Sequence, residues 1–273
     1  MILILGSSGS DVKVLQHRLT KAGYEVIESG TFDEQTLDAV IHFQRANKLV
    51  VDGIVGKKTT SHLLKSGQSY WLNQSDLEQA ALDLGVDMAC IHAVKAVESK
   101  GLGFLDDGRP KILYERHVMR RRMQKNGLGK IAIHNAASSF PNLVNNKTGG
   151  YQGGASEHYR LSLAQTIDNN SALESCSWGL FQIMGYHWQT LGYSSAQEFA
   201  DLMQQSEGNH WQAFTRFVKA DKSLHKALIA KNWAEFARRY NGPGYKKNHY
   251  DIKLAQAYDS YKPMNVNDLA RAN

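Results

Sequence analysis

An internal repeat near the N-terminus most constrains how this chain folds. Residues 30–40 and residues 53–63 share a glycine, an apolar residue two positions later, turn-forming residues, a threonine and then an apolar position at helical spacing. Each copy is typical of a turn that leads into a helix. Residues 36–48 also have apolar residues at helical spacing, and Ser10 with Asp11 is typical of the cap of an earlier helix that ends near Ala22. The first 66 residues are therefore predicted to form a small three-helix bundle.

The chain of 273 residues is long for one domain and comfortable for two. We expect a first domain over residues 1–66, a short polar linker over 67–75 and a second domain over 76–273. Ser75, followed by Glu78 three residues later, is typical of a capping box that begins the first helix of the second domain. Most of the second domain has apolar residues at helical spacing, which predicts a mainly helical fold.

Glu98 closes the apolar stripe of a helix predicted over residues 87–98. Gly101 and Gly103 follow it and are expected to end the helix. A carboxylate in this position is partly desolvated and lies near the negative end of the helix dipole, and both effects favour its protonated form. A protonated carboxyl group is what a general acid needs to protonate a leaving glycosidic oxygen. An exposed glutamate at a frayed helix end would give the same local pattern.

The segment after Glu98 is not helical by pattern. Residues 103–115 predict a hairpin with its turn at Asp107-Gly108, and Glu115 ends the second strand before a helix that runs to about Lys125. Residues 127–156 are rich in Gly, Asn, Ser and Lys, which predicts a long loop, either functional or a plain surface insertion. A further helix is predicted over residues 156–168.

Two later motifs place polar side chains among apolar residues. In residues 177–185, Ser177 begins a tight Ser-x-Gly turn, and the Gln182 amide lies in an apolar run where it needs hydrogen-bond partners. Sugar hydroxyl or N-acetyl groups suit that amide, and a structural role suits it equally. In residues 233–245, a helix is stopped by a glycine and proline turn, with Tyr240 and Asn241 at the break.

The N-terminal repeat lies among three segments that resemble a known family. Residues 6–19, 39–44 and 51–56 are similar, in this order, to the peptidoglycan-binding domain of the three-helix type. The resemblance implies binding to cell-wall peptidoglycan. Asp52 and Gly53 match the family's signature and are the candidate wall-binding residues, although an Asp-Gly pair is also a common turn.

The second domain resembles the lysozyme and lytic-transglycosylase superfamily. The resemblance rests on Glu98-Ser99, on residues 177–183 and on residues 240–242 in that order, and residues 109–117 look like the N-acetylmuramidase domain of modular phage endolysins. A wall-binding domain followed by a catalytic domain is the order common in endolysins of phages that infect Gram-negative bacteria. The fold implied is mainly α: a three-helix bundle, then an α+β lysozyme-like domain with a small β-hairpin.

The same resemblance implies roles for individual residues. Glu98 would be the general acid, and Ser177, Gln182, Tyr240 and Asn241 would line the cleft around the sugar. An inverting hydrolase also needs a base about 6.5–9.5 Å from the acid. Glu115 is the first candidate, ahead of Asp106 and Asp107, but a salt bridge to Arg116 or Arg120 would also explain it.

Three functions therefore stay open. The first is a muramidase that hydrolyses the bond between N-acetylmuramic acid and N-acetylglucosamine. The second is a lytic transglycosylase, in which the muramic acid 6-hydroxyl attacks and no second carboxylate is required. The third is a non-catalytic wall-binding or tail-structure protein with a decayed lysozyme-like domain.

Charge, histidine and cysteine usage limit the partners. The net charge of +6 suggests an anionic partner or surface, and the cluster Arg116, Arg120, Arg121 and Arg122 is either a solvated helix face or a phosphate-binding patch. No nucleic-acid motif accompanies it, and the scattered histidines imply neither a metal nor another cofactor. Cys90 and Cys176 are expected to be buried free thiols.

The N-terminus has too few apolar residues for a signal peptide or a membrane span. We expect a monomer that binds peptidoglycan glycan strands without inserting stably into a membrane. Such a protein would stay in the host cytoplasm until another agent releases it to the periplasmic peptidoglycan.

Overall fold

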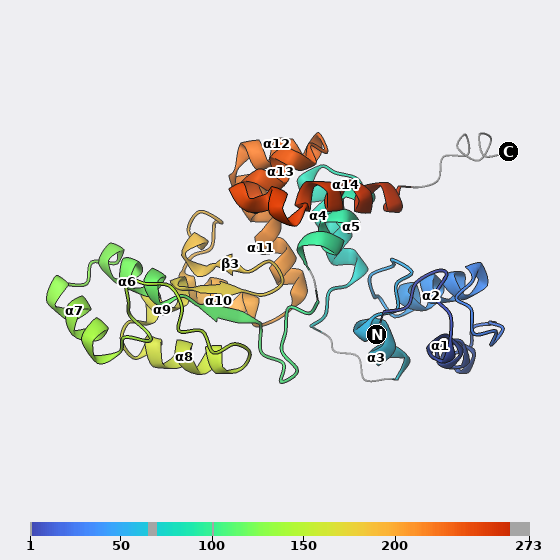
Figure 1. Cartoon of the computed structure of the whole chain (residues 1–273), viewed down its shortest axis with the longest axis horizontal. Helices are drawn as coiled ribbons and strands as arrows, with labels where there is room; N and C mark the ends of the chain where they lie inside the picture. The colour runs from blue at the N-terminus through green and yellow to red at the C-terminus, as the bar shows by residue number, and fades with distance from the viewer. Residues whose placement is uncertain (1, 65–69, 100, 263–273) are drawn as a thin grey trace. The chain divides into compact units, whose positions relative to one another are not determined.

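The computed structural model describes residues 2–64, 70–99 and 101–262. The chain divides into two compact units, residues 1–79 and residues 80–273 (Figure 1). Residues 67–69 of the predicted linker lie outside the described residues. Among the residues that are described, no helix is long and apolar enough to cross a membrane.

The first unit contains the three predicted helices. They are α1 (Ser10–Lys21), α2 (Glu34–Ala46) and α3 (Lys57–Leu63). Apolar side chains from α1 and α2 and from the turns before α2 and α3 form one core, with Val12, Leu15, Leu19, Phe32, Ala39, Val40, Phe43, Leu49 and Val55 buried. The predicted cap of α1 is wrong by one residue, because Gly9 takes the N-cap position and Ser10 lies in the helix.

A buried glutamine explains the internal repeat. Each copy of the repeat binds one such glutamine, which lies on the helix before it. The glutamine side-chain oxygen accepts from the N–H of the repeat glycine. Its side-chain nitrogen donates to the carbonyl of the residue after that glycine and to the hydroxyl of the repeat threonine. In the first copy Gln16 binds Gly30 N, Thr31 O and Thr36 Oγ1 at 2.8, 2.8 and 3.0 Å. In the second copy Gln44 binds Gly53 N, Ile54 O and Thr59 Oγ1 at 2.9, 3.0 and 3.3 Å. The shared pattern therefore encodes two copies of one buried hydrogen-bonded turn.

Helix α4 (Gln74–Leu84) begins two residues earlier than a capping box at Ser75 would place it. The box is made by Asn73 and Asp76 instead. Asn73 Oδ1 accepts from Asp76 N at 3.0 Å, and Asp76 Oδ2 accepts from Asn73 N at 3.0 Å. Asn and Asp satisfy orphan N–H groups at a helix start as Ser and Glu do, so the prediction from Ser75 and Glu78 placed the box two residues too late.

The second unit is mainly helical, as predicted. Its helices after α4 are α5 (Met88–Glu98), α6 (Arg116–Lys125), α7 (Lys130–Ser139), α8 (Ser156–Gln165), α9 (Asn169–Glu174), α10 (Ala196–Met203), α11 (Glu207–Ala220), α12 (Lys222–Ile229), α13 (Trp233–Tyr240) and α14 (Tyr250–Tyr261), with 3-10 turns η1 (Gly185–His187) and η2 (Pro243–Asn248). Helices α13 and α14 pack together, and α14 packs along α5 (Figure 1). This packing brings the end of α13 close to the end of α5.

The small sheet differs from the predicted hairpin. Strands β1 (Ile112–Tyr114), β2 (Cys176–Trp178) and β3 (Ile183–Met184) pair antiparallel in the order β1-β2-β3. The turn at Asp107-Gly108 does form, with Leu105 N donating to Arg109 O at 2.7 Å, but its two arms share only the isolated bridge of Phe104 with Pro110. The groups that would extend this ladder have other partners, because Gly103 N donates to Glu207 Oε1 and Lys111 O accepts from Gly179 N, each at 2.8 Å. Strand β1 instead pairs with β2 from much later in the chain.

The predicted loop over residues 127–156 contains a helix, α7. Only Ile133 of α7 is buried, so the helix has no apolar stripe for the sequence pattern to detect. The Gly-rich remainder, residues 140–154, is an ordered connection to α8. Its anchoring contacts are described with the site below.

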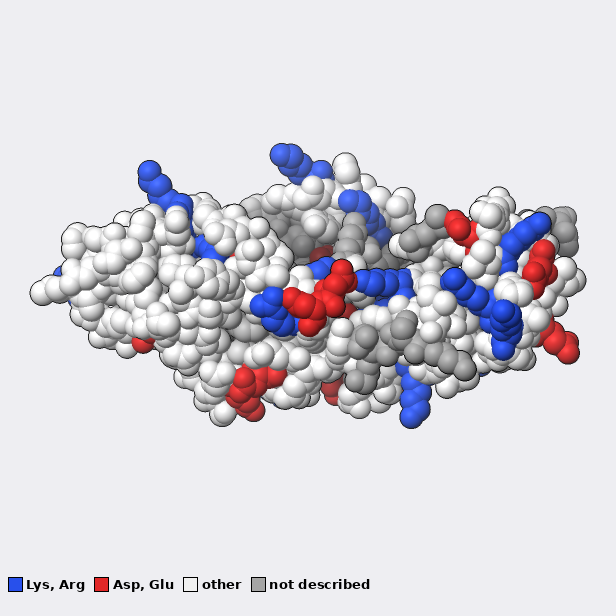
Figure 2. All heavy atoms as spheres, turned by 90° about the horizontal axis from the view of Figure 1, so that it is seen from below, with Lys and Arg blue, Asp and Glu red and all other residues white. Residues whose placement is uncertain are grey.

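Charged side chains are unevenly distributed in the second unit. Between residues 130 and 165 the charged residues are Lys130, Lys147, Glu157 and Arg160, of which the last two are buried. Figure 2 accordingly shows few charged side chains over α7 and α8. Two of the four clustered arginines have partners within the unit, because Arg122 pairs with Glu174 at 2.7 Å and Arg116 donates to loop carbonyls.

Candidate active site

Helix α5 presents Glu98 at its C-terminal end. Its start is fixed by Asp87, whose side chain accepts from Cys90 N at 2.8 Å, and its middle turns are buried. Glu98 is half-buried, and the next residue, Ser99, donates its hydroxyl to Lys95 O at 2.7 Å. The carboxylate is therefore carried by a rigid, buried helix and emerges where that helix ends.

The turn after α13 meets Glu98. Asn241, which follows the last residue of α13, donates from Nδ2 to Glu98 Oε1 at 2.9 Å. The chain can turn away immediately because Gly242 has a φ of 78°, a conformation that favours glycine. Two of the three motifs identified in the sequence, 143 residues apart, thus come together at one carboxylate.

Tyr240 contributes a neutral phenol to the same place. Burial raises the pKa of the Tyr240 hydroxyl well above its ordinary value, and the nearby Glu98 carboxylate raises it further. Its ring packs among Phe214, Phe217 and Phe236, with ring centroids 5.5, 6.0 and 5.8 Å away. The hydroxyl therefore keeps its proton at neutral pH and can donate a hydrogen bond.

Ser177 and Gln182 lie together in the hairpin formed by β2 and β3. Ser177 Oγ donates to Gln182 Oε1 at 2.8 Å, and Gln182 Nε2 donates to Gly179 O at 2.8 Å. Gln182 also has a φ of 51°, which a non-glycine residue seldom adopts. The amide predicted to need partners finds them in its own hairpin, while the residue remains exposed at its surface.

Two buried residues of α11 support this hairpin and the segment after Glu98. A Cβ atom on Gly179 would lie 2.6 Å from His210 Cγ, so only glycine fits there. His210 Nδ1 accepts from Leu180 N at 3.3 Å and Nε2 donates to Met203 O at 2.7 Å. Glu207 Oε1 accepts from Gly103 N at 2.8 Å. Neither residue is among those predicted for the site, and the one sign of them in the sequence is a polar residue on the buried face of a helix.

A cavity of about 360 Å³ lies beside the hairpin. Most of its lining is apolar side chain or glycine backbone, and its polar side chains are those of Lys111 and Gln182. It is lined by Leu102, Leu105, Lys111, Ile112, Leu113, Gly153, Gly154, Gly179, Leu180 and Gln182. The lining thus joins the segment after Glu98, strand β1, the loop before α8 and the β2–β3 turn.

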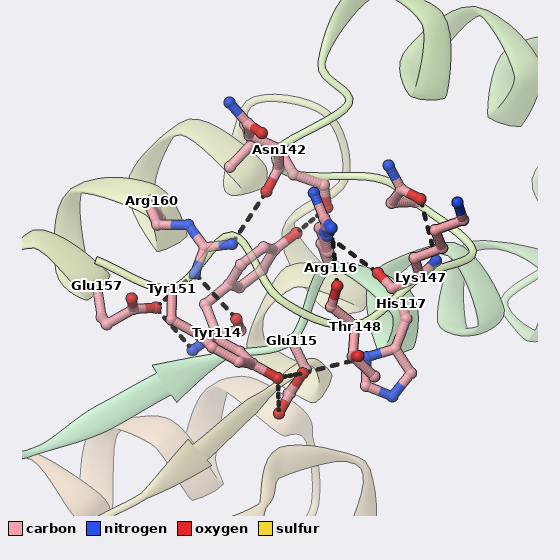
Figure 3. Close-up of polar contacts among 12 residues, drawn as sticks. Tyr114, Glu115, Arg116, His117, Asn142, Lys147, Thr148, Tyr151, Glu157 and Arg160 are labelled. Atoms are coloured by element: carbon pink, nitrogen blue, oxygen red, sulfur yellow. Dashed lines mark hydrogen bonds and ion pairs between the residues drawn. The ribbon is translucent and has the colours of Figure 1, made fainter. Parts of the chain in front are cut away.

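Glu115 is held in a cluster of its own at the start of α6 (Figure 3). Tyr151 Oη lies 3.0 and 2.8 Å from its two carboxylate oxygens, and His117 Nδ1 lies 3.1 Å from Oε2. The His117 contact is an ion-pair distance without good hydrogen-bond geometry. Arg116, an expected alternative partner, instead donates to Lys147 O and Thr148 O at 3.0 and 2.7 Å.

A buried ion pair anchors the loop that carries Tyr151. Glu157 pairs with Arg160 at 2.7 Å and also accepts from the N–H groups of Tyr114, Gln152 and Gly153 (Figure 3). Burial alone would raise the pKa of Glu157, but these N–H groups and the Arg160 charge outweigh it and hold the pKa below its ordinary value. The loop is therefore tied to β1 and α8, which fixes Tyr151 against Glu115.

The other acidic candidates lie in the turn before β1. Asp107 binds Arg109 through Oδ2 at 2.6 Å, and this hydrogen bond lowers the pKa of Asp107. Asp106 is exposed in the same turn. Among the described residues, no cluster of three or more His, Cys, Asp and Glu side chains is arranged to hold a metal ion.

In the first unit, Asp52 and Gly53 form one turn. Asp52 Oδ1 accepts from Ile54 N and from Gln44 Nε2, each at 3.0 Å. Gly53 is buried with a φ of 67°, and a Cβ atom there would overlap Leu37 Cδ1. Both residues thus have clear structural contacts within the bundle.

Comparisons with known proteins match both units. The model of a family described as N-acetylmuramidase matches residues 87–262, and that of a putative peptidoglycan binding domain matches residues 8–63. The crystal structure of the Burkholderia AP3 phage endolysin is similar with a TM-score of 0.86 and 48% identity, over 95% of this chain and 97% of that chain.

A curated relative is similar over a shorter region. It is the N-acetylmuramoyl-L-alanine amidase CwlL of Bacillus licheniformis, 33% identical over 105 residues, which are 37% of this chain and 28% of that protein. The match thus spans little more than a quarter of that relative's length.

Proposed function

Because this chain belongs to the N-acetylmuramidase family of glycoside hydrolases, we propose that it is an endolysin that hydrolyses the β-1,4 bond between N-acetylmuramic acid and N-acetylglucosamine in peptidoglycan. The observation that carries the proposal is the 2.9 Å hydrogen bond from Asn241 Nδ2 to Glu98 Oε1. It joins the helix-end glutamate to the Tyr-Asn-Gly turn, as an acid oriented for proton transfer requires.

In this proposal Glu98 donates its proton to the glycosidic oxygen as the bond breaks. Asn241 Nδ2 donates to Glu98 Oε1 and so orients the carboxyl group. The neutral Tyr240 hydroxyl supplies a hydrogen-bond donor close to the carboxylate as negative charge develops on it. Gln182, exposed at the hairpin turn, contacts the sugar before the scissile bond, and Ser177, buried in β2, lies behind it and donates to its side-chain oxygen.

Glu115 is our candidate for the second carboxylate. Its support is that Tyr151 and His117 hold it in one orientation, and that the loop carrying Tyr151 is anchored by a buried ion pair. In a hydrolase such a carboxylate activates the attacking water or stabilises the oxocarbenium-like transition state.

The N-terminal unit would hold the enzyme on glycan strands of the wall. The match to a putative peptidoglycan binding domain supports this, with the turn at Asp52 and Gly53 as the candidate contact. We propose that the protein is a monomer that waits in the host cytoplasm, reaches the periplasmic peptidoglycan on release and brings about host lysis.

Analysis of the digestion products tests the proposal. Purified Gram-negative peptidoglycan is digested, and the muropeptides are identified by mass spectrometry. We expect reducing N-acetylmuramic acid ends from the wild type and none from Glu98→Gln. Glu78→Gln, a matched change at an exposed position on α4, should digest like the wild type.

Other products would contradict the proposal in distinguishable ways. Anhydro-muramic ends would identify a lytic transglycosylase, and reducing N-acetylglucosamine ends would identify cleavage of the other glycosidic bond. Absence of any product from the wild type would mean a wall-binding protein without catalysis. Equal digestion by Glu98→Gln would remove Glu98 from the mechanism.

A further inference from the structure

The cavity beside the β2–β3 hairpin has a lining that suits a small alkyl group next to an anion. Leu102, Leu105 and Leu180 contribute apolar surface, and glycine backbone forms part of the remaining wall. Among the residues that line it, Lys111 is the one that carries a charge. A mostly apolar cavity with one cationic side chain is a typical binding site for a carboxylate on a short aliphatic stem.

Lys111 is rigidly placed by its main chain. Its N–H donates to Gly103 O at 2.8 Å, and its carbonyl accepts from Gly179 N at 2.8 Å and from Gln182 Nε2 at 3.4 Å. Lys111 thus connects the segment after Glu98 to the hairpin that carries Gln182. Its side chain starts from a fixed point between these two parts of the candidate site.

The Lys111 ammonium lies close to the helix end that carries Glu98. A Cβ atom built on Gly101, three residues after Glu98, would lie 3.8 Å from Lys111 Nζ. Within the described part of the chain, no carboxylate lies at ion-pair distance from this ammonium. The acidic Asp107 of the preceding turn is already paired with Arg109 at 2.6 Å. The positive charge of Lys111 is therefore available to a ligand.

We propose that this cavity binds the 3-O-lactyl substituent of N-acetylmuramic acid, with Lys111 binding a carboxylate that the substituent carries. This inference rests on the proposed muramidase function. The lactyl group has a methyl group suited to the leucine side chains, and its carboxyl group is either free or extended by a stem peptide that ends in carboxylates. Lys111 thereby selects muramic acid over N-acetylglucosamine at the sugar beside Glu98.

Binding measurements on a catalytically silent background test this site. The Glu98→Gln protein, with and without Lys111→Met, is titrated calorimetrically with three soluble glycans. These are peptide-bearing muramyl oligosaccharides, the same oligosaccharides freed of peptide, and chitin oligosaccharides, which have no lactyl group. Lys111→Met keeps the aliphatic stem and removes the charge, so we expect Kd for carboxylate-bearing glycans to rise about tenfold or more.

The pattern across the three glycans identifies the source of the carboxylate. If Kd rises for both muramyl glycans, Lys111 binds the lactyl carboxylate when it is free and a peptide carboxylate when it is not. If Kd rises for the peptide-bearing glycans alone, Lys111 binds a carboxylate of the stem peptide. Chitin oligosaccharides should bind with unchanged Kd, and Lys111→Arg should restore most of the affinity. Lys130→Met, at an exposed position on α7, controls for the general loss of one positive charge.

Two outcomes would overturn the inference. One is an unchanged Kd for both muramyl glycans in Lys111→Met, and the other is an equal rise for chitin oligosaccharides. Thermal unfolding of Lys111→Met shows whether the variant is folded, and Lys111→Arg provides a second variant if it is not. Wild-type digestion products decide the muramidase function separately, so the two proposals can fail independently.

Discussion

At the residue scale, the Asn241 amide determines how the Glu98 carboxylate is oriented. Replacing Asn241 by Ala removes the 2.9 Å hydrogen bond and leaves the aromatic packing of α13 in place. A hydrogen bond to a charged group contributes roughly 1.5–3 kcal/mol, so we expect kcat on peptidoglycan to fall about 10- to 100-fold. Turnover measured beside thermal unfolding checks this. Wild-type kcat in a folded Asn241→Ala protein would mean that Asn241 does not orient Glu98.

Glu115 and Tyr151 allow a graded test of the second carboxylate. Glu115→Gln removes the charge but keeps the shape, and we expect kcat to fall by about 100-fold or more. Tyr151→Phe keeps the carboxylate and removes the hydroxyl that holds it, so the loss should be smaller, roughly 3- to 10-fold. Steady-state turnover of soluble muramyl oligosaccharides measures both variants. If Glu115→Gln turns over like the wild type, Glu115 only anchors the loop that carries Tyr151.

At the element scale, a buried carboxylate joins α6 to α9. Glu174 accepts from Arg122 Nε and Nη2 at 2.7 and 2.8 Å, and from Asn126 and Trp188. Burial alone would raise the pKa of Glu174, but the Arg122 hydrogen bonds and the other donors outweigh it, so the pKa lies below its ordinary value. The unfolded chain therefore binds a proton more readily than the folded chain as the pH falls.

This carboxylate makes stability depend on pH in a defined direction. The contribution of Glu174 is fully present above the ordinary carboxyl pKa of about 4.5 and is lost as the pH falls through the folded-state pKa. Removing one partner of a buried pair costs roughly 3–5 kcal/mol, so Glu174→Gln should unfold at lower temperature at pH 7. Calorimetry from pH 3 to 7 should also show a shallower acid dependence. If the loss of stability at low pH is unchanged in Glu174→Gln, that loss comes from other groups, of which Glu157 is the first candidate.

The elements predicted most reliably from the sequence are helices whose buried apolar residues recur at helical spacing. Helix α5 is buried around its middle turns and α13 buries Phe236 and Ala237, and their predicted ends agree with the structure to within one residue. Helix α7 was missed because it buries little, and the partner of β1 was missed because the pairing with β2 is long-range. No local pattern reports such a pairing.

In the candidate site, too, features with a local sequence signal were predicted and features that depend on long-range packing were not. The approach of Asn241 to Glu98 agrees with the order of motifs in the family, whereas Glu207 and His210 are recognisable only once the fold buries them beneath Gly103 and Gly179. A buried polar residue on an amphipathic helix is indistinguishable, in sequence, from one at the helix boundary. Family resemblance thus predicted that Glu98 and Asn241 belong to one cleft, but not the hydrogen bond between them or the residues that support the site.

At the scale of the whole molecule, the chain has two compact units with different expected tasks. Gly53→Val should impair the task of the first unit alone. Gly53 has a φ of 67°, and any Cβ atom there would overlap Leu37, so the substitution destabilises the first unit. A non-glycine residue in this conformation costs roughly 1–2 kcal/mol before the overlap is counted. We expect weaker retention on insoluble peptidoglycan and unchanged turnover of soluble oligosaccharides.

Gly56→Ala is the matched control for this prediction. Gly56 lies in the same turn with a φ of −104°, and no atom approaches the position of its Cβ within 4 Å. Co-sedimentation with purified sacculi measures retention, and calorimetry locates the unfolding of the first unit. If Gly53→Val lowers the turnover of soluble substrate as well, the two units are not functionally separable.

The two buried cysteines have a practical consequence for studying this enzyme at work. Cys90 and Cys176 are both free and buried, and burial, together with the Asp87 charge, raises the pKa of the Cys90 thiol to about 12. Burial also raises the pKa of the Cys176 thiol well above its ordinary value. Neither thiol forms appreciable thiolate near neutral pH, so neither competes for maleimide reagents. One exposed cysteine introduced into each unit would accept a fluorophore without removal of the native pair, and single-molecule energy transfer could then follow both units along a glycan strand.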